Sequence, residues 1–338
     1  MGFPTVQREG GSSFLPLLLL KEVQAVQVIN RGEVSWQRNL WRRIKKYRML
    51  LLMLVPGVIY YIIFHYMPMY GITLAFKDFK IRRGIMDSPW VGMLYFDKMF
   101  ASEKFWSVVQ NTLVISLLKL VCGFFPPIIL AIALNETPGK RFRSVVQTVS
   151  YLPHFISWVI MAGIIIDMTS LNGPINAIVK LFGGTPVMWM AKKDTFRALL
   201  VITDIWKGFG WGSIIYFAAL AGIDPQQYEA ASIDGAGRLR RIWYITLPNL
   251  VPIITIQMIL SMSGIMNAGF DQIFNMTNSA VSEVSDIIDT YVYNLGVQNR
   301  DYSMATAVGL FKSVIALVLM LVTNFAAKAL NGESYTLW

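Results

Sequence analysis

The sequence predicts an all-α integral membrane protein with six membrane-spanning helices. Hydrophobic residues make up 55% of its 338 residues, whereas charged residues make up only 15%. Soluble domains carry about 25% charged residues, and a single soluble core of this size cannot bury so much apolar surface. The charged residues also flank apolar runs of about 20 residues, the length that crosses a bilayer as a helix. Lipid is therefore expected to be the main solvent of the chain.

Six apolar runs are long enough to span a membrane. In chain order they cover 49–70, 105–134, 145–168, 196–222, 249–270 and 303–327. A basic cluster precedes the first run and predicts a cytosolic N-terminus by the positive-inside tendency; it consists of Arg42, Arg43, Lys45, Lys46 and Arg48. Six crossings then return the C-terminus to the cytosol. The bias is modest, because the first outside loop is itself basic.

These spans divide the chain into three parts. Residues 1–48 are interpreted as a cytosolic N-terminal extension, 49–330 as a six-helix membrane domain, and 331–338 as a cytosolic tail. The short apolar run at 14–20 is not interpreted as a secretory signal, since Lys21 and Glu22 end it early and no small-residue cleavage site follows.

Composition also excludes several kinds of chemistry. Cys122 is the single cysteine, and the two histidines, His65 and His154, lie far apart in the sequence. We therefore expect no disulfide within the chain, no metal site and no catalytic residue. The net charge of +10 does not predict nucleic-acid binding, because Lys and Arg flank apolar runs instead of gathering in one tract.

The loop between the fourth and fifth spans, residues 223–248, begins with a strong helix-start signal. Asp224 can accept hydrogen bonds from the first free amides of a helix, and the fixed φ of Pro225 suits the first helical position. The pattern predicts a short helix over 225–233.

The rest of this loop predicts a bend and a second helix. Gly235 and Gly237 are expected to take positive φ, and a short helix over 238–245 is expected to end before Pro248. From these physical features alone, a protein docking surface and an amphipathic loop that lies on lipid headgroups are equally favoured.

A motif in this loop resembles a known family. The EAA signature of the membrane subunits of binding-protein-dependent ABC importers is matched at every defining position, by Glu229, Ala230, Ala231, Gly235, Ile245, Leu247 and Pro248. The six spans and the place of the motif agree with that family. Within it the chain resembles the maltose-type sugar permeases, and segments 146–158 and 285–294 are similar to the subgroup for oligo- and polysaccharides such as alginate.

The resemblance implies a function and a set of partners. The chain would lie in the bacterial cytoplasmic membrane, and its EAA loop would dock on an ATP-hydrolysing subunit. The assembly would contain two such subunits and a homologous second permease. An extracytoplasmic solute-binding protein, meeting the outside loop 271–302, would deliver a saccharide. ATP and Mg would bind the partner subunits, in agreement with the absence from this sequence of a Gly-x-x-x-x-Gly-Lys-Ser/Thr loop. The chain itself is expected to be no enzyme and to hold no cofactor.

The fifth span has a polar side. If each residue of a continuous helix advances about 100°, five polar residues fall within an arc of about 160°; they are Gln257, Ser261, Ser263, Asn267 and Asp271. This arc predicts a helix that lines a polar pathway, although hydrogen bonding between helices through small residues would produce the same pattern. In permeases that this chain resembles, the corresponding helix lines the sugar pathway, and Ser261 occupies an equivalent place.

Charged residues inside the spans need partners or water. Asp204 and Lys207 lie three residues apart and are expected to pair with each other. Lys119 and Lys312 are expected either to snorkel or to pair across helices, and Lys312 is a further candidate for the substrate pathway. At this point an ion-driven secondary transporter and a membrane-embedded enzyme of glycan or lipid metabolism remain alternatives, although the scattered carboxylates predict no acid–base cluster.

Overall fold

The structure is a computed structural model, and it describes residues 43–331. The predicted run 14–20, most of the predicted N-terminal extension and nearly all of the tail lie outside these residues. The prediction of six spans is confirmed: the helical stretches long and apolar enough to cross a membrane are Arg48–Phe76, Glu103–Asn135, Trp158–Leu181, Lys193–Ala221, Arg238–Met262 and Tyr302–Ala326. The chain separates into two compact units, Met1–Tyr70 and Gly71–Trp338.

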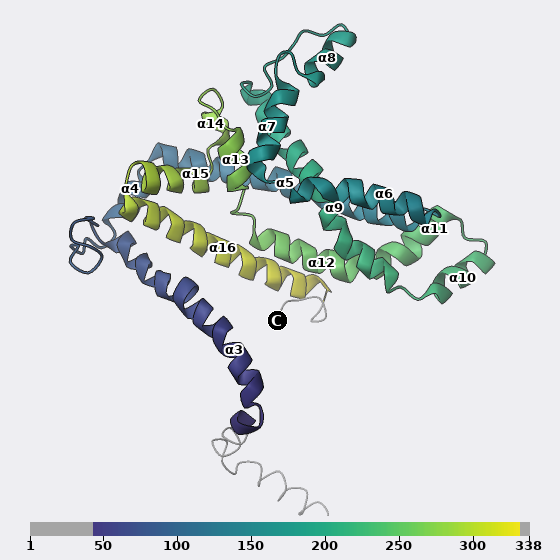
Figure 1. The fold of residues 1–338 in the computed structure, drawn as a ribbon, viewed down its shortest axis with the longest axis horizontal. Helices are drawn as coiled ribbons and strands as arrows, with labels where there is room; N and C mark the ends of the chain where they lie inside the picture. The colour runs from purple at the N-terminus through teal and green to yellow at the C-terminus, as the bar shows by residue number, and fades with distance from the viewer. Residues whose placement is uncertain (1–42, 332–338) are drawn as a thin grey trace, which may run out of the picture. The chain divides into compact units, whose positions relative to one another are not determined.

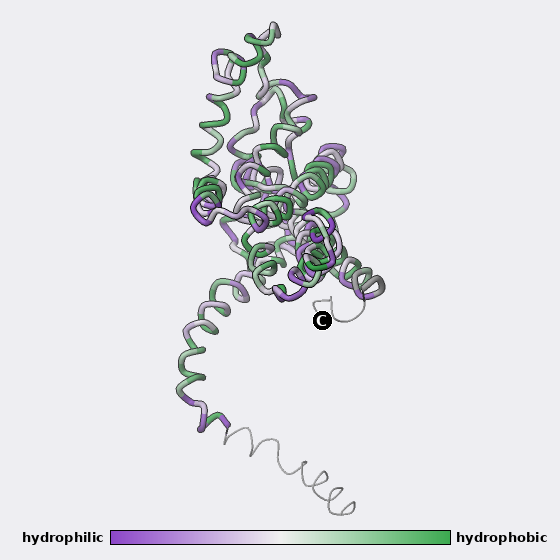
Figure 2. Tube along the Cα trace, turned by 90° about the vertical axis from the view of Figure 1, so that its right-hand side faces the viewer, coloured by the Kyte–Doolittle hydropathy of each residue, from purple (hydrophilic) through white to green (hydrophobic). Residues whose placement is uncertain are grey.

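The first unit is described from residue 43 and contains one long helix. α3 (Arg48–Tyr61) continues into the π-helical η2 (Ile62–Tyr66) and the 3₁₀-helical η3 (Met67–Phe76), which runs into the second unit. Figure 2 shows α3 as a mainly hydrophobic helix whose first residues are hydrophilic. No α3 side chain is buried. An apolar helix without buried side chains is expected to be covered by lipid or by another subunit.

The second unit is built around four long helices. α5 packs mainly against α9, and α12 packs against both α16 and α9 (Figure 1). Its elements, in chain order, are α4 (Leu94–Phe100), α5 (Glu103–Asn135), α6 (Lys140–Tyr151), η4 (Leu152–Phe155), α7 (Trp158–Thr169), α8 (Pro174–Leu181), α9 (Lys193–Ala221), α10 (Pro225–Ile233), α11 (Arg238–Arg241), η5 (Ile242–Thr246), α12 (Leu247–Ser263), α13 (Phe270–Met276), α14 (Ser282–Ser285), α15 (Ile288–Tyr293), η6 (Asn294–Gln298) and α16 (Tyr302–Asn331).

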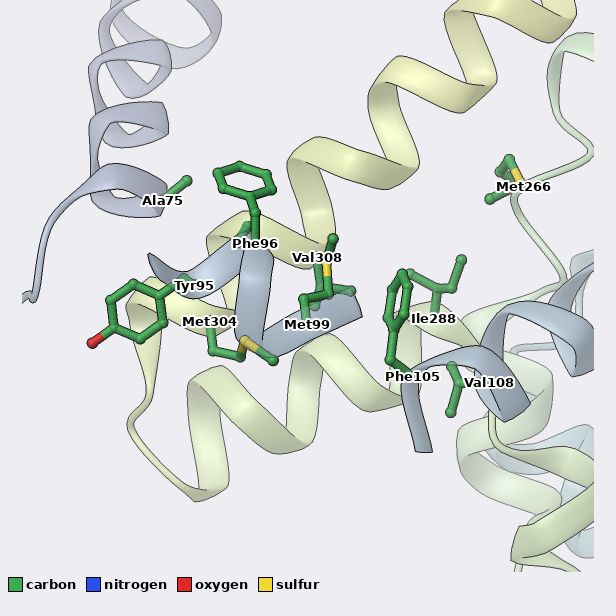
Figure 3. Packing of buried hydrophobic residues seen from close by; sticks show 11 residues of the cluster. Ala75, Tyr95, Phe96, Met99, Phe105, Val108, Met266, Ile288, Met304 and Val308 are labelled. Carbon is green, nitrogen blue, oxygen red and sulfur yellow. The ribbon is translucent and has the colours of Figure 1, made fainter. Parts of the chain in front are cut away.

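Three clusters of buried apolar side chains hold this unit together. The cluster shown in Figure 3 joins α4 and the start of α5 to α15 and the start of α16, with Phe105 and Val308 among its members. A second cluster, around Ile165 and Phe196, joins α7, α9 and α13. The third, around Tyr216 and Leu250, joins α9, the end of α5 and the start of α12. In a membrane such close packing, together with interhelical hydrogen bonds, keeps helices associated.

The third predicted span is not a continuous helix, which corrects the expectation for 145–168. α6 ends at Tyr151, η4 follows, and α7 starts at Trp158 after Ser157, whose hydroxyl accepts a hydrogen bond from the amide of Ile160. Pro153 lies in this break and has no amide hydrogen to continue the helix.

Lys207 on α9 satisfies the backbone at this break. Its ammonium donates to the carbonyl oxygens of Pro153 at 3.1 Å, His154 at 2.8 Å and Ile156 at 2.5 Å. Free carbonyls are costly at membrane depth, and a cation suits the C-terminal end of a helix. The predicted pair between Asp204 and Lys207 is therefore wrong, because the ammonium of Lys207 is used here and Asp204 pairs with a different lysine.

The fifth predicted span also breaks, which corrects the polar arc drawn for 249–270. α12 ends at Ser263, and α13 starts at Phe270 after Gly269, whose φ of +95° lies in the left-handed region that favours glycine. We call residues 264–269 the α12–α13 turn. Because this turn is not helical, helical spacing does not place Asn267 and Asp271 on the same face as Gln257.

Candidate functional site

The loop that carries the EAA-like motif forms a helix, a bend and a second helix. The carboxylate of Asp224 accepts a hydrogen bond from the amide of Gln226 at 2.9 Å, so the predicted helix start of α10 is confirmed. Gly235 has a φ of +73°, as expected for the bend, but Gly237 has a φ of −67° and serves as an ordinary N-cap for α11.

The second helix does not end before Pro248. α11, η5 and α12 follow one another without a gap, and Pro248 lies in the first turn of α12. A proline removes one backbone donor, and the wider π-helical turn of η5 directly before it accommodates that loss. The bend is therefore joined to the fifth span by a single uninterrupted helical stretch.

Side-chain hydrogen bonds brace α10 against this stretch. Each joins a residue near or on α10 to one on α11, η5 or α12: Tyr228 to Thr246 at 3.0 Å, Arg241 to Ser232 at 2.9 Å, and Asn249 to Gln227 at 3.1 Å. The brace joins α10, α11 and the start of α12 into one packed piece.

This piece presents a mixed surface. Glu229, Ala230, Gly235 and Pro248 are exposed, whereas Ala231, Ile245 and Leu247 are half-buried. Sequence reasoning missed four large apolar side chains that are strongly exposed beside them: Ile233, Leu239, Trp243 and Tyr244. Their presence in an otherwise polar loop was the available signal, because exposed apolar patches mark contacts with other proteins or with lipid.

A cavity of about 360 Å³ lies between α5, α9, α12 and the α12–α13 turn. Glycines contribute to its wall from three sides, and they leave room that larger side chains would fill; they are Gly123, Gly208, Gly212, Gly264 and Gly269. Its polar lining is Ser116, Lys119, Asp204, Tyr216, Gln257, Ser261 and Asn267. The cavity thus combines hydroxyls, amides, one cation and one carboxylate in an otherwise apolar wall.

The structure brings together only part of the predicted pathway residues. Gln257, Ser261 and Asn267 line the cavity. Asp271 is exposed in the first turn of α13, and neither it nor Lys312 lines the cavity. The side chain of Ser263 lies outside the described part of the structure.

Lys312 lies instead in an ion pair on α16. Its ammonium contacts the carboxylate of Asp289 on α15 at 2.5 Å. The expectation that Lys312 would snorkel or pair across helices is confirmed as pairing. The contact joins α15 to α16.

Lys119 and Asp204 form an ion pair in the cavity wall that sequence reasoning did not assign. The ammonium of Lys119 on α5 lies 3.2 Å from a carboxylate oxygen of Asp204 on α9. It also donates to the carbonyl oxygen of Ala268 at 2.8 Å and to the side-chain oxygen of Gln272. Pairing of Lys119 across helices, one of the two expectations, is confirmed.

The lining favours hydrogen bonding over bond-making chemistry. Ser116 is buried beside Lys119, and its hydroxyl has no hydrogen-bond partner among the described residues. Within residues 43–331, no three His, Cys, Asp or Glu side chains gather closely enough to hold a metal ion. Donors and acceptors spread over an apolar surface are suited to a polyhydroxylated ligand.

At the end of the bundle away from α10, polar contacts tie α14 and the residues after it to α5 and α9. The side-chain amide of Asn111 donates to the carbonyls of Glu283 at 2.8 Å and Asp286 at 3.1 Å. Arg197 donates to Asn111 at 2.7 Å and to the carbonyl of Val284 at 3.1 Å. These contacts fix the position of α14 and of the residues that lead into α15.

The chain is similar to known transport proteins. The family model for the binding-protein-dependent transport system inner membrane component matches residues 123–332. Protein LplB of Bacillus subtilis is 42% identical over 308 residues, which is 90% of this chain and 96% of the relative. The polygalacturonan/rhamnogalacturonan transport system permease protein YteP of the same organism is 39% identical, over 88% of this chain and 93% of the relative.

A solved structure has the same fold. The crystal structure of a bacterial ABC transporter involved in the import of the acidic polysaccharide alginate contains a chain that matches with a TM-score of 0.81 and 39% identity. The match covers 87% of this chain and 99% of the other.

Proposed function

Because this chain belongs to the family of binding-protein-dependent transport system inner membrane components, we propose that it forms half of a membrane pathway for an oligosaccharide. ATP hydrolysis in partner subunits would be coupled to this pathway through α10. The chain is a multi-pass membrane protein with the all-α, six-span fold of the maltose-type ABC permeases. It is the permease subunit of a sugar ABC importer, as the resemblance implied. We further propose how the chain is coupled to ATP hydrolysis, where the solute passes, which solute it is and how the chain is oriented in the membrane.

The braced α10 carries the proposal. Its motif residues Glu229 and Ala230 are exposed, and Ile233 and Tyr244 add apolar surface next to them. A small-residue helix with one charge allows a partner to approach closely and to orient. We assign this surface to an ATP-hydrolysing subunit, which places α10 and both termini of the chain in the cytosol.

The pathway is assigned to the cavity between α5, α9 and α12. Gln257, Ser261 and Asn267 supply hydrogen-bonding groups from the fifth span and the turn that follows it, and Asp204 adds a carboxylate. A carboxylate and side-chain amides are good partners for sugar hydroxyls. A homologous second permease would supply the other half of the pathway.

The solute is proposed to be an acidic oligosaccharide of the alginate type, with neutral oligosaccharides as the alternative. In the proposed orientation an exposed basic group, which includes Lys80, Arg82 and Arg83, faces the outside. Such a group raises the local concentration of an anionic solute. Delivery would depend on an extracytoplasmic binding protein, and ATP and Mg²⁺ would bind the two ATP-hydrolysing subunits.

The proposal is tested on the purified assembly. The chain, its second permease and the ATP-hydrolysing subunits are reconstituted, and ATP hydrolysis is measured with binding proteins loaded with alginate oligosaccharides or neutral oligosaccharides of equal length. We expect alginate oligosaccharides to stimulate hydrolysis and uptake. Uptake that proceeds without any ATP-hydrolysing subunit would instead support an ion-driven transporter.

A single substitution tests the coupling surface. Glu229→Lys reverses the charge on the exposed face of α10, so we expect the ATP-hydrolysing subunits no longer to co-purify although the chain is still inserted. Glu229→Gln keeps the size of the side chain and serves as the matched control, with partial association expected. Full association and uptake in Glu229→Lys would exclude this surface as the coupling site.

A further inference from the structure

We infer that Lys119 is a positioning residue that keeps the cavity closed at the end away from α10, by holding the α12–α13 turn against α5 and α9. The inference rests on the proposed function, because it takes this end as the entry for the solute. The contacts that carry it come from α5, α9, α13 and the turn.

The turn is a wall of the cavity with few hydrogen bonds of its own. Gly264, Asn267, Ala268 and Gly269 line the cavity. Within the turn and toward α12, three backbone amides donate hydrogen bonds to backbone carbonyls. The last of them is the amide of Asn267, which donates to the carbonyl of Gly264. The carbonyl of Ala268 accepts its hydrogen bond from Lys119, a residue of a different helix.

Lys119 uses all three of its N–H donors in this place. Its acceptors are Asp204 on α9, the carbonyl of Ala268 in the turn and the side chain of Gln272 on α13. The Lys119 side chain is only 10% exposed, so loss of these partners would leave a charge without solvation. The ammonium therefore ties α5 to α9, α13 and the turn at one point.

Gln272 extends this tie to the backbone of α9. The Gln272 side chain is fully buried, and its amide donates to the carbonyl of Leu200 and to the hydroxyl of Thr203, both at 2.8 Å. The start of α13 is thus fixed to α9 directly and to α5 through Lys119. Removing the ammonium would leave two buried oxygens, those of Ala268 and Gln272, without their donor.

Gly269 shows how closely the ammonium packs against the turn. A Cβ atom built on Gly269 would lie 2.8 Å from the Lys119 nitrogen, and the residue has a φ of +95°. Glycine is therefore required here both for the backbone conformation and for the approach of Lys119. A substitution at Gly269 would push the same ammonium away from Ala268, which provides a second way to disturb the closure.

Asp204 gives the closure a way to open. Its side chain is 39% exposed and lines the cavity, whereas Ala268 and Gln272 are fully buried. If the turn moves away from α5, Lys119 loses the carbonyl of Ala268 but keeps the carboxylate of Asp204. Charge pairing is maintained in both positions, so opening requires no isolated buried charge.

Lys312 and Lys207 also contact partly buried groups of the bundle, but they do not have this role. Lys312 pairs with Asp289 and Lys207 donates to the carbonyls of the α6–α7 break, and neither lines the cavity. Lys312→Met is therefore a matched control for Lys119→Met, since it removes the same ammonium from another partly buried ion pair.

The test measures access to the cavity from outside in the complete assembly. Cys122 is replaced by Ser, Ser261→Cys places a thiol in the cavity, and resting right-side-out vesicles are treated with a membrane-impermeant charged thiol reagent. We expect Lys119→Met to raise the labelling rate about tenfold or more, because the loss of buried hydrogen bonds destabilises the closed state relative to the open one. Lys119→Arg should keep labelling within about threefold of the parent, since it retains a cation.

The outcomes separate this inference from a merely structural role and from the proposed function. Unchanged labelling in Lys119→Met, or an equal rise in Lys312→Met, would overturn the inference. If Lys119→Met does not assemble, Gly269→Ala takes its place, and unchanged labelling there overturns it equally. The labelling rate requires no transport, so an assembly that labels as expected but takes up no saccharide would refute the proposed function and leave the closure in place.

Discussion

At its N-terminal end α12 continues from α11 and η5 without interruption, whereas at its C-terminal end it stops at Ser263 and the chain turns before α13. The first end is exposed and is braced by neutral and charged side chains close to one another in the sequence. The second end is held by Lys119, which is about 150 residues away along the chain. One end is thus continuous with the helix before it and tied to it by local contacts, and the other is held by a contact from a distant helix.

The largest expected effect in this comparison comes from two glycines with positive φ. Gly269 at +95° would place a Cβ 2.8 Å from the Lys119 nitrogen, whereas a Cβ on Gly235 at +73° meets nothing within 4 Å. Both alanine variants force a non-glycine residue into the left-handed region, which costs about 1–2 kcal/mol. We expect Gly269→Ala to lower the free energy of unfolding by about 2–3 kcal/mol, because the Lys119 ammonium must also move and its hydrogen bond to Ala268 is weakened. Gly235→Ala should lower it by about 1–2 kcal/mol.

Thermal unfolding of the two purified variants in the same detergent measures this difference. Equal losses of stability would show that the close approach of Lys119 to the turn is unimportant. The comparison between the two ends of α12 would then fail.

A smaller effect is expected from the brace at the other end. Tyr228→Phe removes the hydrogen bond to Thr246, which is worth about 0.5–1.5 kcal/mol, and keeps the ring. Stability should change little, but saccharide taken up per ATP hydrolysed should fall severalfold, since α10 loses one link to α12. Ser232→Ala removes the neighbouring link to Arg241 and should add to the loss. An unchanged ratio in the double variant would mean that the brace does not transmit movement.

The smallest expected effect lies near the start of α4 and depends on pH. The hydroxyl of Tyr95 donates to Asp78 at 2.8 Å and holds the pKa of that carboxyl below its usual range, with Lys80 adding to the effect. Burial raises the pKa of Tyr95 to about 12. A depressed carboxyl pKa contributes stability that is present above the unfolded pKa and is lost as the pH falls through the folded pKa.

Tyr95→Phe removes the main cause of the lowered Asp78 pKa. Its deficit in stability relative to the parent should therefore be present near neutral pH and should shrink as the pH falls below about 4. Below the unfolded pKa of a tyrosine, about 10, the hydroxyl of Tyr95 stays protonated in both states and adds no slope. Thermal unfolding from pH 7 to pH 3 measures the difference, and a deficit that grows toward low pH contradicts the assignment.

Sequence patterns predicted several local features of the loop that carries the EAA-like motif correctly. Asp224 and Pro225 start α10, and Gly235 bends the chain, because capping and backbone conformation depend on neighbouring residues. The same reasoning was wrong for Gly237 and for the end of the second helix at Pro248. There the π-helical turn accommodated the proline, and no short-range rule requires such a turn.

Helical periodicity succeeded and failed within a single span. Gln257 and Ser261 lie one turn apart on α12 and both line the cavity, so they share one face of the helix as the periodicity predicts. Asn267 also lines it, but only because the chain turns after Ser263, so its place does not follow from helical spacing. Asp271 follows the turn and lies outside the cavity wall.

The sequence by itself determined that this is a six-span membrane protein and where its EAA-like loop bends, because hydropathy over about 20 residues and capping are local properties. Only the tertiary structure decided where the third and fifth spans break and which partners Lys119, Lys207 and Lys312 take. A long, flexible ammonium at membrane depth contacts whichever carboxylates or free carbonyls packing brings near, and a helix breaks where such a donor can satisfy its backbone.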